Sequence, residues 1–177
     1  ALLGMTIEHF AYKPLRQAPA LSVLITAIGV SYLLQNLALL IFGSQQKAYP
    51  TLVSLPELRL GPVTVSGITL LTLATTALIM VGLTLFINRT KLGKAMRAVS
   101  EDKAAASLMG ISVNRTITLT FVIGSALAAF ASIFYGMSYV YIKPTTGAMP
   151  GIKAFTAAVF GGIGSIPGAF LGGLLLG

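Results

Sequence analysis

Four stretches of this chain contain no charged side chain, and each is long enough to cross a lipid bilayer as a helix. They are 17–46, 60–88, 116–142 and 154–177. A helix needs roughly 20 residues to cross the hydrocarbon core. With 55% apolar and 9% charged residues, the chain could not cover a water-soluble surface. No stretch alternates between polar and apolar residues as membrane-barrel strands do. The sequence therefore predicts an all-α, polytopic helical membrane protein with about four membrane segments.

Turn residues and charges between these stretches place the predicted spans at 21–42, 63–87, 116–141 and 154–177. A polar loop, 88–115, separates the second span from the third. We expect residues 1–177 to form a single transmembrane domain, truncated at both ends, because the chain begins and stops within apolar sequence.

Lysine and arginine residues predict the orientation of these spans, since they gather in cytoplasmic loops. Eight of them lie in 8–16 and 88–115, whereas four lie in the loops on the opposite side. We name residues 8–16, which precede the first span, the connector. The connector and the loop 88–115 are therefore predicted to be cytoplasmic.

Residues that perform catalysis are scarce in this chain. It has four acids, none of them in a predicted span, one histidine and no cysteine. No metal-ligand spacing, nucleophile motif or phosphate-binding loop occurs. We therefore predict that the chain is not an enzyme and that it binds no metal or cofactor. No basic stripe interleaved with aromatic residues indicates nucleic acid. A transporter driven by another subunit, an ATP-independent channel or carrier, and a packing subunit of an assembly stay open at this point.

Glycine and proline interrupt the last apolar segment at membrane depth, where backbone groups released by a break need partners within the protein or a wet cavity. One interpretation is a broken helix that lines a substrate path. The other is a close helix crossing, with Gly164, Gly168 and Gly172 at four-residue spacing. The interrupting residues are candidates for a translocation path: Gly161, Gly162, Gly164, Pro167 and Gly168.

Two amides of the first span, Gln35 and Asn36, are further candidates for the translocation path. Amides at this depth need polar partners, so they face protein or water rather than lipid. They either bond across helices or contact a polar ligand.

The loop 88–115 contains the pattern of a short helix that ends at a glycine. Ser100 is the predicted N-cap, acids follow it, and Gly110 is the predicted left-handed stop with Ile111 beside it. Small residues at 104–106 would let a soluble partner approach closely. The helix is either a coupling element for a separate ATPase or an amphipathic helix at lipid headgroups. The candidate coupling residues are Glu101, Asp102, Ala105, Ala106 and Gly110.

Several motifs carry a resemblance to a known family. They are Glu8-x-x-Ala11-Tyr12-Lys13-Pro14-Leu15-Arg16, Gly93-Lys94-Ala95-Met96-Arg97-Ala98, Glu101-Asp102, Gly110-Ile111 and the run 151–168 from Gly151-Ile152-Lys153 to Ile166-Pro167-Gly168. In this order they resemble the permease subunits of branched-chain amino acid ABC importers, of the H-type.

The resemblance implies a multi-pass protein of the bacterial inner membrane that imports leucine, isoleucine or valine. It also implies that the candidate coupling residues contact an ATPase. The implied partners are a second permease subunit, two ATP-binding cassette subunits that use ATP and Mg²⁺, and a periplasmic substrate-binding protein. Related permeases for amides or urea are the alternative, since no residue singles out leucine.

Overall fold

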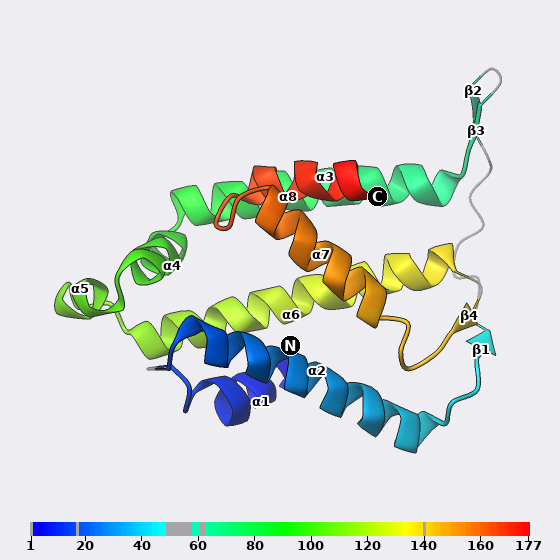
Figure 1. The fold of residues 1–177 in the computed structure, drawn as a ribbon. Helices are drawn as coiled ribbons and strands as arrows, with labels where there is room; N and C mark the ends of the chain where they lie inside the picture. Colours follow the sequence, from blue (N-terminus) through cyan, green and yellow to red (C-terminus); the bar gives the residue numbers. More distant parts are fainter. Residues whose placement is uncertain (1, 17, 49–57, 61–62, 140) are drawn as a thin grey trace. The chain divides into compact units, whose positions relative to one another are not determined.

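Three helices of membrane length dominate the computed structural model, which describes residues 2–16, 18–48, 58–60, 63–139 and 141–177. They are α2 (Ala20–Phe42), α3 (Gly67–Arg89) and α6 (Val113–Ser138) (Figure 1). Their long uninterrupted apolar sequences explain why they are helical, because a helix bonds its own backbone groups. The prediction of an all-α polytopic membrane protein is confirmed.

These long helices expose large apolar side chains. At the end of α2, Leu40, Ile41 and Phe42 are 83%, 72% and 62% exposed. Each Å² of such surface costs about 25 cal/mol in water. Lipid or further protein must therefore cover the helices, as expected for a multi-pass membrane protein.

The described chain divides into two compact units, of which the first holds residues 1–45 and 91–131. It contains α1 (Leu2–Ile7), the π-helical turn η1 (Glu8–Tyr12), α2, α4 (Lys91–Glu101), α5 (Lys103–Leu108) and the first part of α6. Gly4 lets α1 touch α6, since a Cβ there would lie 2.5 Å from Ser125 Oγ. The Tyr12 ring packs on Phe121 with centroids 4.9 Å apart, and burial raises the pKa of Tyr12.

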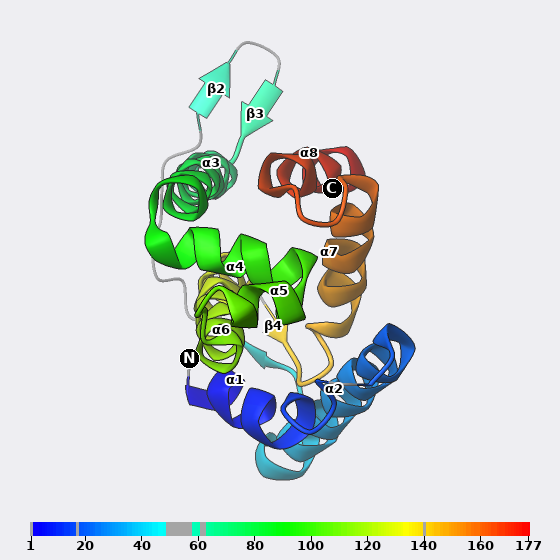
Figure 2. The ribbon, with the colours of Figure 1, turned by 90° about the vertical axis from the view of Figure 1, so that its left-hand side faces the viewer.

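The second unit holds residues 46–90 and 132–177. Two short helices, α7 (Ala148–Phe160) and α8 (Ile166–Leu176), pack against each other, and α8 also contacts α3. Strand β1 (Lys47–Ala48) pairs antiparallel with β4 (Tyr141–Ile142), with Lys47 opposite Ile142. Strands β2 (Leu58–Leu60) and β3 (Val63–Val65) form a separate antiparallel pair, which Figure 2 shows beyond the start of α3.

The segment predicted as the fourth span folds as α7, a reversal at 161–165, and α8. Helix α7 begins at Ala148, ahead of the predicted start at 154. Gly162 and Gly164 have φ of +89° and +97°, values that suit glycine. The Ser165 hydroxyl accepts a hydrogen bond from Gly168 N at 3.2 Å and caps α8, while Pro167 occupies the first turn, where no donor is needed.

Glycines set how closely α7 and α8 pack. A Cβ on Gly161 would lie 2.1 Å from Gly168 O, and one on Gly172 would lie 2.4 Å from Ala157 O. The close-packing interpretation therefore holds for Gly168 and Gly172. It is wrong for Gly164, which lies in the reversal with nothing within 4 Å of its Cβ position. The predicted spacing of four residues assumed one continuous helix. Because the chain reverses at 161–165, Gly161 rather than Gly164 lies at the α7–α8 contact.

Contacts between loops fit three crossings of the membrane. Strand β1 follows α2 and strand β4 follows α6, and the two strands pair. Lys103, between α3 and α6, donates to the carbonyl of Arg16, ahead of α2, at 3.3 Å. Each of these pairs is separated by two long helices, as two crossings of the membrane between the members of a pair would require.

Gly172→Ala is expected to destabilise the protein by about 1–3 kcal/mol, because its methyl group would overlap the Ala157 carbonyl. Gly173→Ala is the matched control, since nothing lies within 4 Å of its Cβ position. The control is expected to be neutral or slightly stabilising, as alanine favours the helix. Heating the full-length protein in detergent, followed by size-exclusion chromatography, measures both. Equal losses of stability would contradict the close α7–α8 contact.

Candidate functional site

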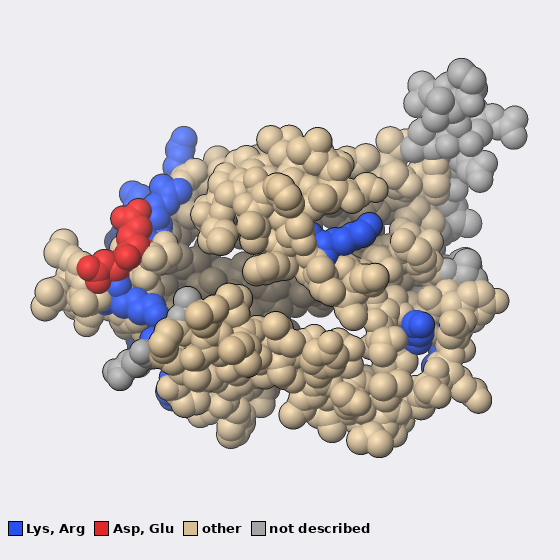
Figure 3. All heavy atoms as spheres, viewed as in Figure 1, with Lys and Arg blue, Asp and Glu red and all other residues tan. Residues whose placement is uncertain are grey.

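Helices α4 and α5 form the polar part of the first unit. Lys91, Lys94 and Arg97 of α4 are exposed, whereas Val99 is only 5% exposed and Ala106 of α5 only 3%. Figure 3 shows basic and acidic atoms gathered over these two helices on the face in view. Helix α4 thus has a buried apolar side that includes Val99, and its charged side faces outward.

Asp102, rather than the predicted Ser100, caps α5. The Asp102 Oδ1 atom accepts hydrogen bonds from Ala104 N at 2.7 Å and Ala105 N at 3.1 Å. Ser100 still lies in α4, where its hydroxyl donates to Arg97 O. Serine and aspartate are both good N-caps, but only the residue with an extended backbone can cap, and Asp102 has φ −147° and ψ 113°.

Gly110 ends α5 as predicted, in the left-handed conformation with φ +79°. Its N–H donates to Ser107 O at 3.0 Å, and Ile111 N donates to Ala106 O at 3.0 Å. These two bonds make a Schellman motif, which satisfies the last carbonyls of the helix.

The exposed side of α5 differs in part from the predicted coupling residues. Glu101, Asp102 and Ala105 are exposed, but Ala106 points inward and is buried. At the C-terminal end, Leu108 is 89% and Met109 82% exposed. Sequence reasoning missed these two residues and named the buried Ala106 as a coupling residue instead. The result is an apolar tip on a polar helix, which we call the α5 tip (Leu108 and Met109).

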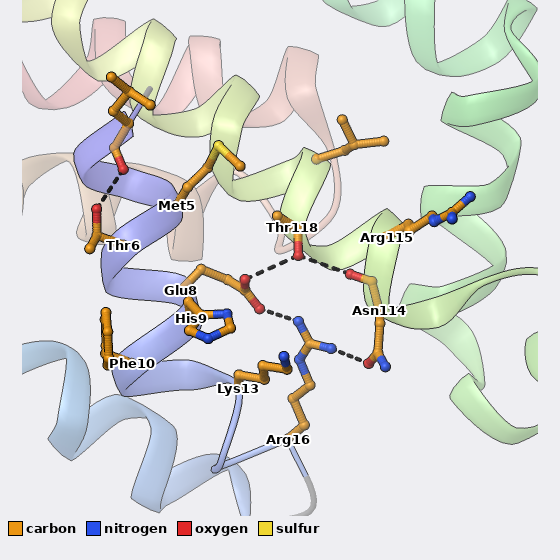
Figure 4. Close-up of a pocket in the computed structure, with 12 residues that line it drawn as sticks. Met5, Thr6, Glu8, His9, Phe10, Lys13, Arg16, Asn114, Arg115 and Thr118 are labelled. Atoms are coloured by element: carbon orange, nitrogen blue, oxygen red, sulfur yellow. Dashed lines mark hydrogen bonds and ion pairs between the residues drawn. The ribbon is translucent and has the colours of Figure 1, made fainter.

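A buried ionic network joins the connector to the start of α6, as Figure 4 shows. The Glu8 side chain is only 2% exposed and forms an ion pair with Arg16. Its second oxygen accepts a hydrogen bond from Thr118 Oγ1 at 3.0 Å, and Arg16 Nη1 donates to Asn114 Oδ1. A buried carboxylate is tolerated only when it is paired in this way. We call these four residues, Glu8, Arg16, Asn114 and Thr118, the clamp.

Sequence reasoning placed Glu8 and Arg16 in a cytoplasmic connector and did not predict the clamp. The spacing of Asn114 and Thr118, one helical turn apart, was the available signal for a polar face on α6. An open cavity of about 690 Å³ lies beside the clamp, with Leu2, Met5 and Phe10 in its wall.

The two amides of the first span find partners within α2. Gln35 Nε2 donates to Ser31 Oγ at 3.2 Å, and Asn36 Nδ2 donates to Tyr32 O at 2.8 Å. The interpretation that they also bond across helices stays a prediction. Residues four apart in a helix lie on one face, which makes these bonds available without a neighbour. Among the other translocation-path candidates, Gly161 and Gly168 are brought into backbone contact.

Comparison with known proteins gives consistent matches. The family model described as branched-chain amino acid transport system, permease component, matches residues 1–177. The high-affinity branched-chain amino acid transport system permease protein BraD of Pseudomonas aeruginosa is 52% identical over 98% of this chain. The corresponding LivH protein of Escherichia coli is 46% identical over 98%. The chain spans 58% of the length of both relatives.

A more distant relative carries a different substrate in its name. The autoinducer 2 import system permease protein LsrC of an Enterobacter species is 36% identical over 62% of this chain and 34% of its own length. No solved structure matches the chain.

Gly110→Val is expected to open the end of α5, because a β-branched residue disfavours positive φ by about 1–2 kcal/mol. Gly110→Asn is the matched variant, since asparagine tolerates this conformation. Hydrogen exchange of the full-length protein measures the effect. The amides of residues 110 and 111 are expected to exchange about tenfold faster in the valine variant and close to wild type in the asparagine variant. Unchanged exchange in the valine variant would contradict the Schellman motif.

Proposed function

Because the chain belongs to the branched-chain amino acid transport system permease family, we propose that it is the membrane-spanning part of a permease subunit in an ATP-driven importer. Its substrates are branched-chain amino acids, and it forms part of their path. The observation that carries this proposal is 52% identity to a permease of that name over 98% of the chain, on three helices of membrane length.

The proposed assembly follows from the same family. It contains a second permease subunit, two ATPase subunits that bind ATP and Mg²⁺, and a periplasmic substrate-binding protein, all at the bacterial inner membrane. This chain itself performs no chemistry and holds no cofactor. The loop 88–115 and the connector face the cytoplasm, where the excess of lysine and arginine lies.

In this proposal the α4–α5 pair is the contact to an ATPase subunit. The α5 tip supplies exposed apolar surface on a water-facing helix, the kind of patch that protein partners cover. Glu101 at the end of α4, the N-cap Asp102 and Ala105 of α5 are exposed as well. Gly110 fixes where α5 ends. Ala106 is buried within the chain and is therefore not a contact for the partner in this proposal.

The proposed path uses the candidates in the first span and in the reversal. The α7–α8 reversal places the glycines at 161, 162 and 164 and the capped start of α8 within an apolar segment, an arrangement that suits a broken helix lining a path. Gln35 and Asn36 keep acceptor oxygens beyond the bonds that their NH₂ groups donate.

The complete transporter, reconstituted in proteoliposomes with its binding protein, is expected to take up radiolabelled leucine only when ATP and Mg²⁺ are supplied. Valine and isoleucine are expected to compete, and urea and acetamide are not. Competition by urea or acetamide alone would move the protein to the amide-specific branch of the superfamily. Uptake that needs no nucleotide would overturn the ATP-driven proposal in favour of a channel or carrier.

A single cysteine that replaces Leu108 is expected to cross-link to an ATPase subunit in native membranes, because Leu108 is 89% exposed. The sequence 1–177 contains no cysteine that would compete with it. Any cysteines elsewhere in the full-length protein are removed first. Met149→Cys is the matched control, since Met149 is 72% exposed at the start of α7, next to a turn that the charge distribution predicts to lie on the opposite side of the membrane. Capture of the ATPase from residue 149 but not from residue 108 would reverse the proposed orientation.

A further inference from the structure

Arg16 is the residue through which three separate segments of the first unit meet. Its guanidinium group contacts Glu8 in the connector and Asn114 in α6. Its backbone carbonyl accepts a hydrogen bond from Lys103 Nζ at 3.3 Å, and Lys103 is the first residue of α5. The first span, α2, begins at Ala20, shortly after Arg16.

The clamp is built as a stiff link. Glu8 is 2% exposed and the Arg16 side chain 15%, so water screens their attraction weakly. The guanidinium is planar, and its two terminal nitrogens bind different partners, Nη2 to Glu8 and Nη1 to Asn114. A lysine ammonium has no such planar fork. Movement of Arg16 is therefore tied to both Glu8 and α6.

From this geometry we propose that Glu8 and Arg16 are positioning residues that transmit movement of the coupling helix α5 to the first span α2. The proposal rests on the proposed function, because the movement originates in an ATPase subunit at the α5 tip. Chain connectivity alone joins α5 to α4 and α6. The bond from Lys103 and the clamp add a route to α2, which the backbone reaches from α5 only by way of α4 and α3.

Thr118 provides a variant that weakens the clamp without leaving a charge unpaired. Its hydroxyl lies 3.0 Å from Glu8 Oε2 and 3.0 Å from Asn114 O in its own helix. Thr120 offers the matched control, because its hydroxyl donates only to Thr116 O at 2.9 Å among the described bonds. Thr118→Val and Thr120→Val both remove a bond within α6, but only the first removes a bond to Glu8.

The test uses the complete transporter in proteoliposomes and measures ATP hydrolysis and leucine uptake in the same sample. Thr118→Val and Arg16→Lys are expected to keep assembly, ATP hydrolysis and the KM for the substrate-loaded binding protein. Uptake per ATP hydrolysed is expected to fall by about fivefold or more, since couplings of this kind span roughly 5- to 150-fold. Thr120→Val is expected to match wild type in every measurement.

Hydrogen exchange of residues 18–25 gives a readout that does not depend on substrate. In wild type and in Thr120→Val, exchange in this segment is expected to change when the ATPase subunits bind ATP. The change is expected to be lost in Thr118→Val. Wild-type uptake per ATP and a wild-type exchange response in Thr118→Val and Arg16→Lys would overturn the inference and leave the proposed function intact. A wild-type complex without ATP-driven uptake would instead overturn the proposed function, and this inference with it.

Discussion

Every backbone N–H and C=O at bilayer depth must find its partner inside the protein, and the described fold follows from that constraint. Uninterrupted apolar sequence satisfies it by forming α2, α3 and α6. Hydroxyls at this depth obey the same rule, as Thr72 and Thr76 bond the preceding turn of α3. Where the chain must reverse, at 161–165, Gly162 N bonds Val159 O and Ser165 N bonds Gly162 O. The reversal therefore leaves these donors paired without a neighbouring helix, and glycine is needed because two positions have positive φ.

A buried acidic side chain needs partners within the protein for the same reason. Glu8 lies at the junction of α1 and the connector, where burial would be costly for an unpaired carboxylate. Arg16 and Thr118 remove that cost by occupying both of its oxygens. Glu101 and Asp102 need no such partner because they are exposed to water, and Asp102 instead serves the amides of α5. Burial within the protein thus decides whether one of these acids needs a cationic partner.

Sequence alone predicted the features that depend on local residues. Helix length follows from charge-free runs, and the left-handed stop at Gly110 follows from one residue type. The position of the α5 cap was missed by two residues, because Ser100 and Asp102 are both suitable and the end of α4 decides between them. The clamp was missed for a different reason: Glu8 and Thr118 are 110 residues apart, and a polar residue in a connector carries no sign of its distant partner. The register of the α7–α8 contact likewise depends on the reversal, which turns Gly164 away and brings Gly161 into its place.

A buried ion pair contributes little net stability, since apolar residues of similar volume often do as well or better. Stability therefore does not explain why a guanidinium and a carboxylate stand where apolar side chains would also pack. The pair instead fixes an orientation, because Arg16 is bonded to both Glu8 and Asn114, and Glu8 is held in turn by a hydrogen bond from Thr118. Two routes then leave α5. One is the chain itself, which turns at Gly110 and enters α6, and the other runs from Lys103 through Arg16 toward α2. Two residues of the clamp, Asn114 and Thr118, belong to α6, so both routes reach the first turns of that helix. Displacement of α5 relative to α6 must therefore either move Arg16 as well or break its hydrogen bonds.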